Sequence, residues 1–425
     1  MIKIKQYGEK ILYLSLFLLL LYLIYLWRIN TSSREYRIVM FLYSINFVYL
    51  VTKLSLALTY LPSRGPVKKF KISVIIPSFN EDKESVEKAV LTLLKQTYPI
   101  HEIIFIDDGS ENEDAYLAIK NLKIENLVDI NEVNKNIKLT SVRLEQNSGK
   151  KKAQEVGFIQ ATGDLFLLVD SDGEITETAL EEMIRPFGDP KVGSVVGKIE
   201  VRNLSDNFWT RLQDIIYSNS FQIGRASQSQ TGNVIVCSGA LSMHRANFVK
   251  RNMRTFRKET FMGIPCSAGD DRLLTDISLE RRYKTVYQST AICYTDVPNS
   301  LKKFFKQQVR WTKSALIMTL FSFRYCFIRP FSMVWQLLET YLWLYNVIVT
   351  LTLLWQHKLG IGVEVSFVAV VYFILVSYLS NIFYTKRNIK TYLITFVYSF
   401  FYSVLLFGIR CYSLGTILKT GWTTR

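Results

Sequence analysis

The sequence predicts an α/β domain with a mixed, mainly parallel sheet, joined to α-helical transmembrane segments. Three observations lead to this fold class. Apolar strand-like runs alternate with helical patterns in the middle of the 425-residue chain, as they do in doubly wound sheets. Short polar clusters directly follow three of those runs. Long apolar runs with few charges occupy both ends of the chain.

Residues 1–61 are expected to form two transmembrane helices. Residues 11–27 carry no charge, and residues 38–61 contain Lys53 but can cross a hydrocarbon layer of about 30 Å. A cleaved signal peptide is the alternative for the first run. No small-residue cleavage site follows it and a second apolar run begins soon after, which favours a membrane span.

Residues 62–298 are expected to form a cytoplasmic α/β domain. Its first strand should cover residues 71–77, its first helix 84–95 and its second strand 102–106. Residues 164–169 are apolar enough for a central strand. Because helical patterns separate the strands, the sheet should be largely parallel, with its ligand site at the carboxyl ends of the strands.

Polar clusters lie at three of these strand ends. They are Asn80-Glu81, Asp107-Asp108 and Asp170-Ser171-Asp172. One such cluster would be weak evidence because Asp and Asn are common turn residues, but three at equivalent ends indicate a shared site. Asp170 and Asp172 alternate along the chain, so both carboxylates can face one hard cation. A cation held in this way can bind a diphosphate.

A basic turn, NSGKKK, covers residues 147–152. A flexible turn with backbone N–H groups and lysines can cradle phosphates. The alternative is a solvated lysine run that leads into a helix. The position of the turn between the second strand and the Asp170 cluster favours ligand binding.

The segment Gly269-Asp270-Asp271-Arg272 places two carboxylates side by side. Adjacent carboxylates repel each other, and burial can raise the pKa of one of them, which suits a general base. The alternative is a helix N-cap, a position that Asp favours. Both interpretations are compatible, because a base at the start of a helix is well oriented.

Residues 299–330 are expected to form amphipathic interfacial helices that contain a Q-x-x-R-W pattern. On a helix, Gln307, Arg310 and Trp311 share one face. Arg can bind a phosphate with two N–H groups, and Trp can stack on a sugar ring. The alternative is an interfacial tryptophan with a snorkelling arginine. The surrounding lysines indicate contact with anionic membrane lipids.

Residues 331–425 are expected to form membrane helices and a cytoplasmic tail. The apolar runs cover residues 333–355, 361–384 and 391–409. Glu339 and Glu364 lie near run ends, where interfacial placement and a polar path are both reasonable. The distribution of Lys and Arg places residues 62–330 in the cytoplasm. If the third run crosses, the C-terminus lies outside; if that run is re-entrant or interfacial, the C-terminus lies inside.

Composition excludes several classes of function. The net charge is +16, but no nucleic-acid motif is present, so the basic excess is assigned to the membrane surface. The chain contains only three histidines, which argues against a His-based zinc site and against a Ser-His triad. No nucleic acid is expected as a partner, and the sequence leaves the oligomeric state open.

Taken together, these motifs resemble those of the processive family-2 glycosyltransferases, which include cellulose, chitin and hyaluronan synthases. Within that family, bacterial hyaluronan synthases of the streptococcal type are most similar, on the stretches 228–239, 287–298, 306–314 and 422–425. The usual ending is W-G-T-R, and Thr423 replaces the glycine here. Nodulation-type chitin oligosaccharide synthases share almost every catalytic motif and are the alternative; they typically begin with fewer spans.

The resemblance implies a GT-A-like catalytic domain and an inverting polymerisation at the plasma membrane. The implied donors are UDP-GlcNAc and UDP-glucuronate, and the implied product is a growing polysaccharide that leaves across the membrane. The alternative product, chitin, would need UDP-GlcNAc alone. Mg²⁺ or Mn²⁺ is the implied cofactor.

Carried over residue by residue, the resemblance also implies site roles. Asp271 would be the base, with Asp270 beside it, and Asp170 and Asp172 would hold the metal. The implied nucleotide-binding residues are Pro77, Asn80, Glu81, Asp108, Lys150, Asp170, Arg310, Trp422 and Arg425. The implied acceptor-binding residues are Gln307, Trp311 and Cys237, although Cys237 can equally be a small core residue.

Overall fold

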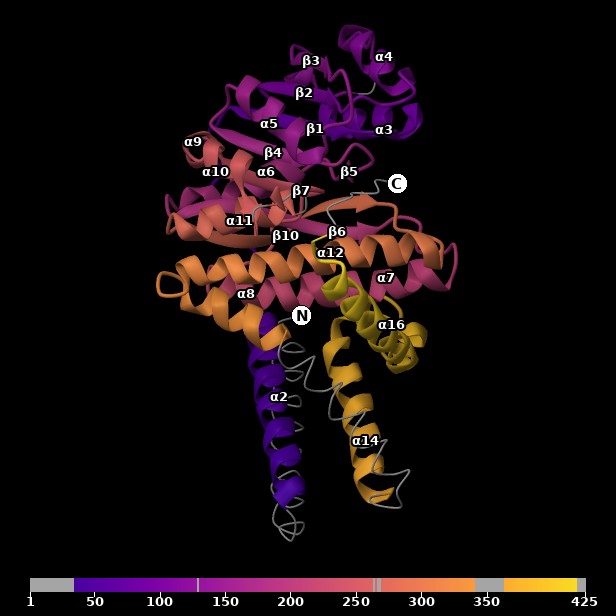
Figure 1. Ribbon diagram of the computed structural model, residues 1–425. Helices are drawn as coiled ribbons and strands as arrows, with labels where there is room; N and C mark the ends of the chain where they lie inside the picture. Colours follow the sequence, from indigo (N-terminus) through magenta and orange to yellow (C-terminus); the bar gives the residue numbers. More distant parts are fainter. Residues whose placement is uncertain (1–33, 128–129, 263, 266–268, 341–362, 419–425) are drawn as a thin grey trace. The chain divides into compact units, whose positions relative to one another are not determined.

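The computed structural model describes residues 34–127, 130–262, 264–265, 269–340 and 363–418 (Figure 1). The predicted span 11–27, most of the predicted span 333–355, and the candidate residues Trp422 and Arg425 lie outside the described residues. The chain divides into two compact units. A helical unit comprises Met1–Tyr60 and Leu337–Phe396, and an α/β unit comprises Leu61–Gln336 and Val397–Arg425.

The α/β unit is built on an eight-stranded mixed sheet with the order β3-β2-β1-β4-β7-β6-β10-β5. Its strands are β1 (Ile72–Ser78), β2 (Glu102–Asp107), β3 (Lys138–Arg143), β4 (Leu165–Val169), β5 (Glu174–Ile175), β6 (Val192–Val201), β7 (Leu241–Arg245) and β10 (Lys284–Thr295). A separate hairpin pairs β8 (Thr260–Phe261) with β9 (Ile264–Pro265).

The sheet is mainly parallel, as the sequence predicts. Strands β3, β2, β1 and β4 are parallel neighbours, and so are β6 and β10. Strand β7 runs antiparallel between β4 and β6, and β5 pairs antiparallel with β10. The chain order reverses around β1, and such a switch creates a crevice outside the carboxyl ends of the strands.

The predicted strands and first helix are confirmed within one or two residues. Strand β1 is buried on both faces because a parallel sheet is covered by helices, and this explains its continuous apolar sequence. Helix α3 (Lys83–Leu94) begins after Asp82, whose carboxylate accepts the N–H of Ser85 at 2.9 Å. Residues 150–160 form α5, so the lysine run opens a helix.

The remaining helices of the α/β unit follow in sequence order. They are α4 (Asp114–Lys120), α6 (Ala179–Ile184), α7 (Phe208–Asn219), the π-helix η4 (Ser220–Arg225), α8 (Ala226–Gln230), α9 (Ala246–Arg251), α10 (Met253–Lys258), α11 (Asp270–Glu280) and α12 (Leu301–Phe321). The Q-x-x-R-W pattern therefore lies on a 21-residue helix, as predicted.

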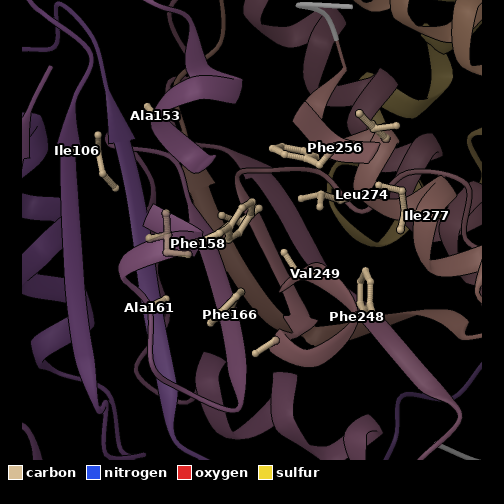
Figure 2. Close-up of a cluster of buried hydrophobic side chains, with 14 of the residues drawn as sticks. Ile106, Ala153, Phe158, Ala161, Phe166, Phe248, Val249, Phe256, Leu274 and Ile277 are labelled. Carbon is tan, nitrogen blue, oxygen red and sulfur yellow. The ribbon is translucent and has the colours of Figure 1, made fainter. Parts of the chain in front are cut away.

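A hydrophobic core joins the sheet to the helices that carry the candidate site (Figure 2). The ring of Phe158 in α5 stacks on Phe166 of β4 at a centroid distance of 5.6 Å and meets Phe256 of α10 edge-on at 5.7 Å. Leu274 and Ile277 of α11 belong to the same buried cluster. Helix α11 is therefore fixed to the sheet by close packing, which makes it a rigid support.

The helical unit contains α2 (Arg34–Thr59), α14 (Val363–Ser380), α15 (Ile389–Leu393) and the start of α16 (Thr395–Gly415). Among the described residues, α16 has both the length and the apolar composition of a membrane span. Whether the run 391–409 crosses stays open, and the predicted spans 38–61 and 361–384 stay predictions. Lys53 and Glu339, two charges in predicted spans, pair at 2.8 Å, and Tyr49 donates to the same Glu339 oxygen at 3.3 Å.

Candidate active site

The ends of β1 and β2 form one corner of the candidate site. Asn80 has a φ of +52°, a left-handed conformation that Asn tolerates better than most residues. Its N–H donates to Ser110 Oγ and its Oδ1 accepts the N–H of Glu111, both at 2.9 Å. These two hydrogen bonds join the turn after β1 to the turn after β2, at the edge of the sheet where the sequence predicts a ligand site.

Asp108 is buried and faces the basic turn. Its two carboxylate oxygens accept the backbone N–H groups of Ser148 at 2.9 Å and Gly149 at 2.8 Å. Burial raises the pKa of Asp108 despite these two hydrogen bonds, which oppose the shift, and the neighbouring Asp107 adds to it. Asp108 therefore fixes the turn that begins α5.

The three lysines of the basic turn point to different places. Lys150 forms an ion pair with Asp170, whereas the ammonium of Lys151 lies 5.4 Å from the ring centroid of Phe256. Lys152 pairs with Glu155 at 3.2 Å. Of the three lysines that the sequence predicts for phosphate binding, only Lys150 therefore lies beside the Asp170 cluster.

The Lys150 ammonium pairs with Asp170 and is also within electrostatic range of Asp270 and Asp271. Burial opposes its charged form, but Asp170, Asp270 and Asp271 outweigh that effect and raise the pKa of the ammonium. Gly239 closes the same space, since a Cβ there would lie 3.3 Å from Lys150 Nζ and 3.9 Å from Asp170 Oδ1. The structure therefore brings together a cation and the two predicted acidic clusters.

Asp172 lies at the other end of the Asp170 cluster and is buried. Thr295 Oγ1 is 3.5 Å from its Oδ2. The described residues contain no group of three or more His, Cys, Asp or Glu side chains arranged around one point. Two carboxylates are the usual protein share of a magnesium site that is completed by substrate phosphates and water. The donor set thus fits a metal that arrives with a phosphorylated substrate.

Asp270 and Asp271 form the first turn of α11. The N-cap is Gly269, with a φ of +77°, so neither aspartate caps the helix. Asp270 Oδ2 accepts a hydrogen bond from Gln154 Nε2 at 2.6 Å. Burial and the charge of Asp270 raise the pKa of Asp271 to about 6, while Lys150 and the backbone N–H groups of Arg272 and Gly239 oppose the shift. Such a carboxyl can accept a proton near neutral pH.

The expected face of α12 borders these groups. Ser314 lies one turn from Arg310, and a Cβ on Gly269 would approach Ser314 Oγ to 2.1 Å. The Trp311 side chain remains 39% exposed, and its ring centroid lies 6.1 Å from that of Tyr217 in α7. Burial raises the pKa of Tyr217, and its hydroxyl also senses the charges of Arg310 and Asp170. Helices α7, α11 and α12 therefore converge on one site.

Cys237 is fully buried, and its N–H donates to Thr275 Oγ1 of α11 at 2.9 Å. Burial raises the pKa of its thiol to about 12, so the sulfur is neutral and unreactive at neutral pH. Cys237 is thus a small core side chain, as one interpretation of the sequence has it, and it also lies close to the candidate base Asp271.

Sequence reasoning missed Gly239, Gln154 and Tyr217. Gly239 reaches the site because β7 runs antiparallel to β4, with Leu241 opposite Val169, so the segment before β7 lies beside Asp170. A glycine before a strand does not by itself indicate that the residue borders an active site. Gln154 and Tyr217 lie inside helices, where only the packing reveals their neighbours.

Comparison with known proteins gives consistent matches. Residues 73–252 match the family described as "Glycosyl transferase family 2", and residues 165–414 match "Glycosyl transferase family group 2". The chain is 37% identical over 381 residues to hyaluronan synthase of Streptococcus pyogenes, which covers 90% of this chain and 89% of that protein. It is 32% identical to an N-acetylglucosaminyltransferase of Rhizobium meliloti, over 57% of this chain and 55% of that protein.

A solved structure supports the fold. The mannosyltransferase of Pyrobaculum calidifontis, in complex with GDP-Man and Mn²⁺, superposes with a TM-score of 0.55 and 16% identity, over 89% of this chain and 95% of that chain. The shared feature at this level is the α/β architecture with its mixed sheet.

Proposed function

The chain belongs to glycosyl transferase family 2, and we propose that it is a processive inverting glycosyltransferase that polymerises UDP-GlcNAc and UDP-glucuronate into hyaluronan. The observation that carries this function is the similarity to a streptococcal hyaluronan synthase along 90% of the chain. The similarity to N-acetylglucosaminyltransferases covers only 57%, which favours hyaluronan over chitin.

The nucleotide of the donor would bind at the ends of β1, β2 and β4. In this proposal, Pro77, Asn80, Glu81 and Asp108 hold the uridine end, and Lys150 meets the diphosphate. Asp170 and Asp172 would hold Mg²⁺ or Mn²⁺; the ion pair of Asp170 with the Lys150 ammonium supports a site that attracts cations. When bound, the metal would neutralise charge on the departing diphosphate. Trp422, Arg425 and Arg310 are further proposed nucleotide contacts.

The transfer step would be a single displacement. A hydroxyl oxygen of the acceptor attacks the anomeric carbon while the bond from that carbon to the UDP oxygen breaks. Asp271 takes the hydroxyl proton, and UDP leaves with the bonding electron pair, stabilised by Lys150. Attack from the opposite face converts the α-linked donor into a β-linked product, so no enzyme nucleophile is needed. The raised pKa of Asp271 supports its role as the base.

The acceptor would lie against α12. We assign it to Gln307, Trp311 and the Cys237 segment, because Trp311 lies beside Tyr217 of α7 and Cys237 is held by Thr275 of α11, the helix that carries Asp271. The exposed Trp311 ring offers a flat apolar surface on which a sugar can stack. Repeated transfer at one site requires the product to move on, and in this proposal the polymer leaves across the membrane.

In this proposal the protein is a multi-pass enzyme of the cell membrane. Residues 62–298 would be the cytoplasmic catalytic domain, 299–330 the interfacial helices, and 1–61 and 331–425 the membrane segments and tail. The ring of Phe208 in α7 stacks on that of Tyr398 in α16, with the ring centroids 4.9 Å apart. The ring centroids of Phe305 in α12 and Tyr412 in α16 lie 5.6 Å apart. These contacts lie within the α/β unit, to which residues 397–425 belong, and they support an interfacial rather than a crossing α16.

The decisive experiment supplies purified protein with each UDP-sugar alone and with both together. Polymer that forms only with both donors supports hyaluronan. Polymer from UDP-GlcNAc alone would identify a chitin synthase instead. Absence of sugar transfer from any UDP-sugar would refute the proposed function itself.

A further inference from the structure

The segment 231–240, which we call the pre-β7 loop, separates α8 from β7 and forms one wall of the candidate site. Three elements hold it. Gln228 of α8 accepts the N–H of Ile235 at 3.3 Å, and Thr275 of α11 accepts the N–H of Cys237 at 2.9 Å. Arg225 donates from Nη2 to Ser238 Oγ at 3.0 Å.

The loop acts on the candidate base through Gly239. The backbone N–H of Gly239 faces the Asp271 carboxylate and acts to lower its pKa, and Thr275, which holds Cys237, donates to the Asp271 carbonyl at 2.8 Å. The absence of a side chain at Gly239 leaves the space that Lys150 and Asp170 occupy. A shift of the loop would therefore move a hydrogen-bond donor of the base and change the space around Lys150.

Arg225 is itself held in a fixed position. It is the last residue of the π-helix η4, a local widening of the helix that is frequent at functional sites. Its guanidinium carbon lies 4.0 Å from the centroid of the Phe221 ring, and it also donates to the backbone carbonyl of Ser220. Because Phe221 and Ser220 hold the planar guanidinium of Arg225 in place, its hydrogen bond can hold Ser238 in place in turn.

We propose that Arg225 is a positioning residue for sugar transfer: through Ser238 it fixes the pre-β7 loop, so that Gly239 meets Asp271 and Lys150 in the geometry that transfer needs. This inference rests on the proposed function and assigns the Arg225–Ser238 pair to the transfer step rather than to nucleotide binding. Small displacements in such sites have large effects on turnover.

The test measures kcat, KM for each donor and UDP affinity for Ser238→Ala, Arg225→Met and the double variant. We expect each single variant to lower kcat about tenfold with little change in UDP affinity. Because both substitutions break one link, the double variant should match a single variant within about twofold. Ser238→Thr keeps the hydroxyl and should restore kcat. Arg211→Met, on the exposed face of α7, is the control.

Three results would overturn the proposal. They are wild-type kcat in Ser238→Ala, loss of UDP affinity in parallel with kcat, and losses that multiply in the double variant, which would indicate that Arg225 contacts the substrate itself. Ser238→Ala removes a single hydroxyl, so it keeps the test valid if Arg225→Met fails to fold. A wild-type protein that transfers no sugar would refute the proposed function instead, so the two failures are distinct.

Discussion

Gly269 and Ser314 approach so closely that a Cβ on the glycine would lie 2.1 Å from the serine Oγ. This contact joins the start of α11, which carries the candidate base, to α12, which carries the Q-x-x-R-W face. The positive φ of Gly269 adds a second reason for glycine, since other residues pay about 1–2 kcal/mol in this conformation.

Gly269→Ala should therefore separate the two helices and lower turnover at least about tenfold. The measurement is kcat together with the thermal melting temperature. Gly188→Ala is the control, because no heavy atom lies within 4 Å of a Cβ at that position. Adding Ser314→Gly to Gly269→Ala should recover part of the loss. Wild-type kcat in Gly269→Ala would show that the contact is unimportant for transfer.

Asp271→Asn should keep donor binding and stop transfer. The amide has nearly the same shape but accepts no proton, and a general base supplies about 10²–10⁴-fold in rate. UDP binding by calorimetry and polymer synthesis from both donors are the two measurements. Normal synthesis by Asp271→Asn, combined with an inactive Asp270→Asn, would assign the base to the neighbouring residue.

Turnover should decrease as the pH falls through about 6, the value to which burial and Asp270 raise the pKa of Asp271. Turnover falls in this direction because Asp271 is proposed as the base: below this pH its carboxyl is protonated and accepts no proton. One unit below the pKa about one tenth of the carboxylate remains, so kcat at pH 5 should be about tenfold below its plateau. UDP affinity over the same range is the control, and a kcat that is flat from pH 7 to below 5 would contradict this assignment.

Removal of divalent cations should abolish synthesis, because Asp170 and Asp172 are proposed to meet the diphosphate through a metal. EDTA should stop polymer formation, and added Mg²⁺ or Mn²⁺ should restore it. Asp172→Asn should weaken the activation by metal, whereas Asp114→Asn, on α4, should leave it unchanged. Full activity in chelator would remove the metal from the proposed mechanism.

The tail after α16 should lie in the cytoplasm. A cysteine introduced by Thr424→Cys into a chain whose Cys411 has been replaced by serine should resist a membrane-impermeant thiol reagent in intact cells and react after lysis. The reason is the contact of α16 with α7 and α12 through Tyr398 and Tyr412. Labelling in intact cells would place the tail outside and exclude Trp422 and Arg425 from the site.

Strands β1, β2 and β4 of the parallel half could be predicted because each is an apolar run that ends in polar residues. Strand β1 and the Asp170 cluster are examples. Strand β3, by contrast, is polar and only partly buried and shows no such pattern. The neighbours of Lys150 could not be predicted, since three consecutive lysines look alike in sequence and only the rotation of α5 distinguishes them. The N-cap of α11 could not be predicted either, because Asp is a common cap residue and only the backbone shows the left-handed turn that favours Gly269.

The direction of β7 has a consequence for how such an enzyme can change. Because β7 begins where β4 ends, one edge of the sheet receives both the segment that leaves β4 and the segment that enters β7. The former carries the carboxylates proposed for the donor, and the latter faces the candidate base. In the proposed mechanism these two segments, far apart in the sequence, meet at one edge, and Gly239 brings the second beside Lys150 and Asp170, so a substitution before β7 would alter the surroundings of both the base and the diphosphate.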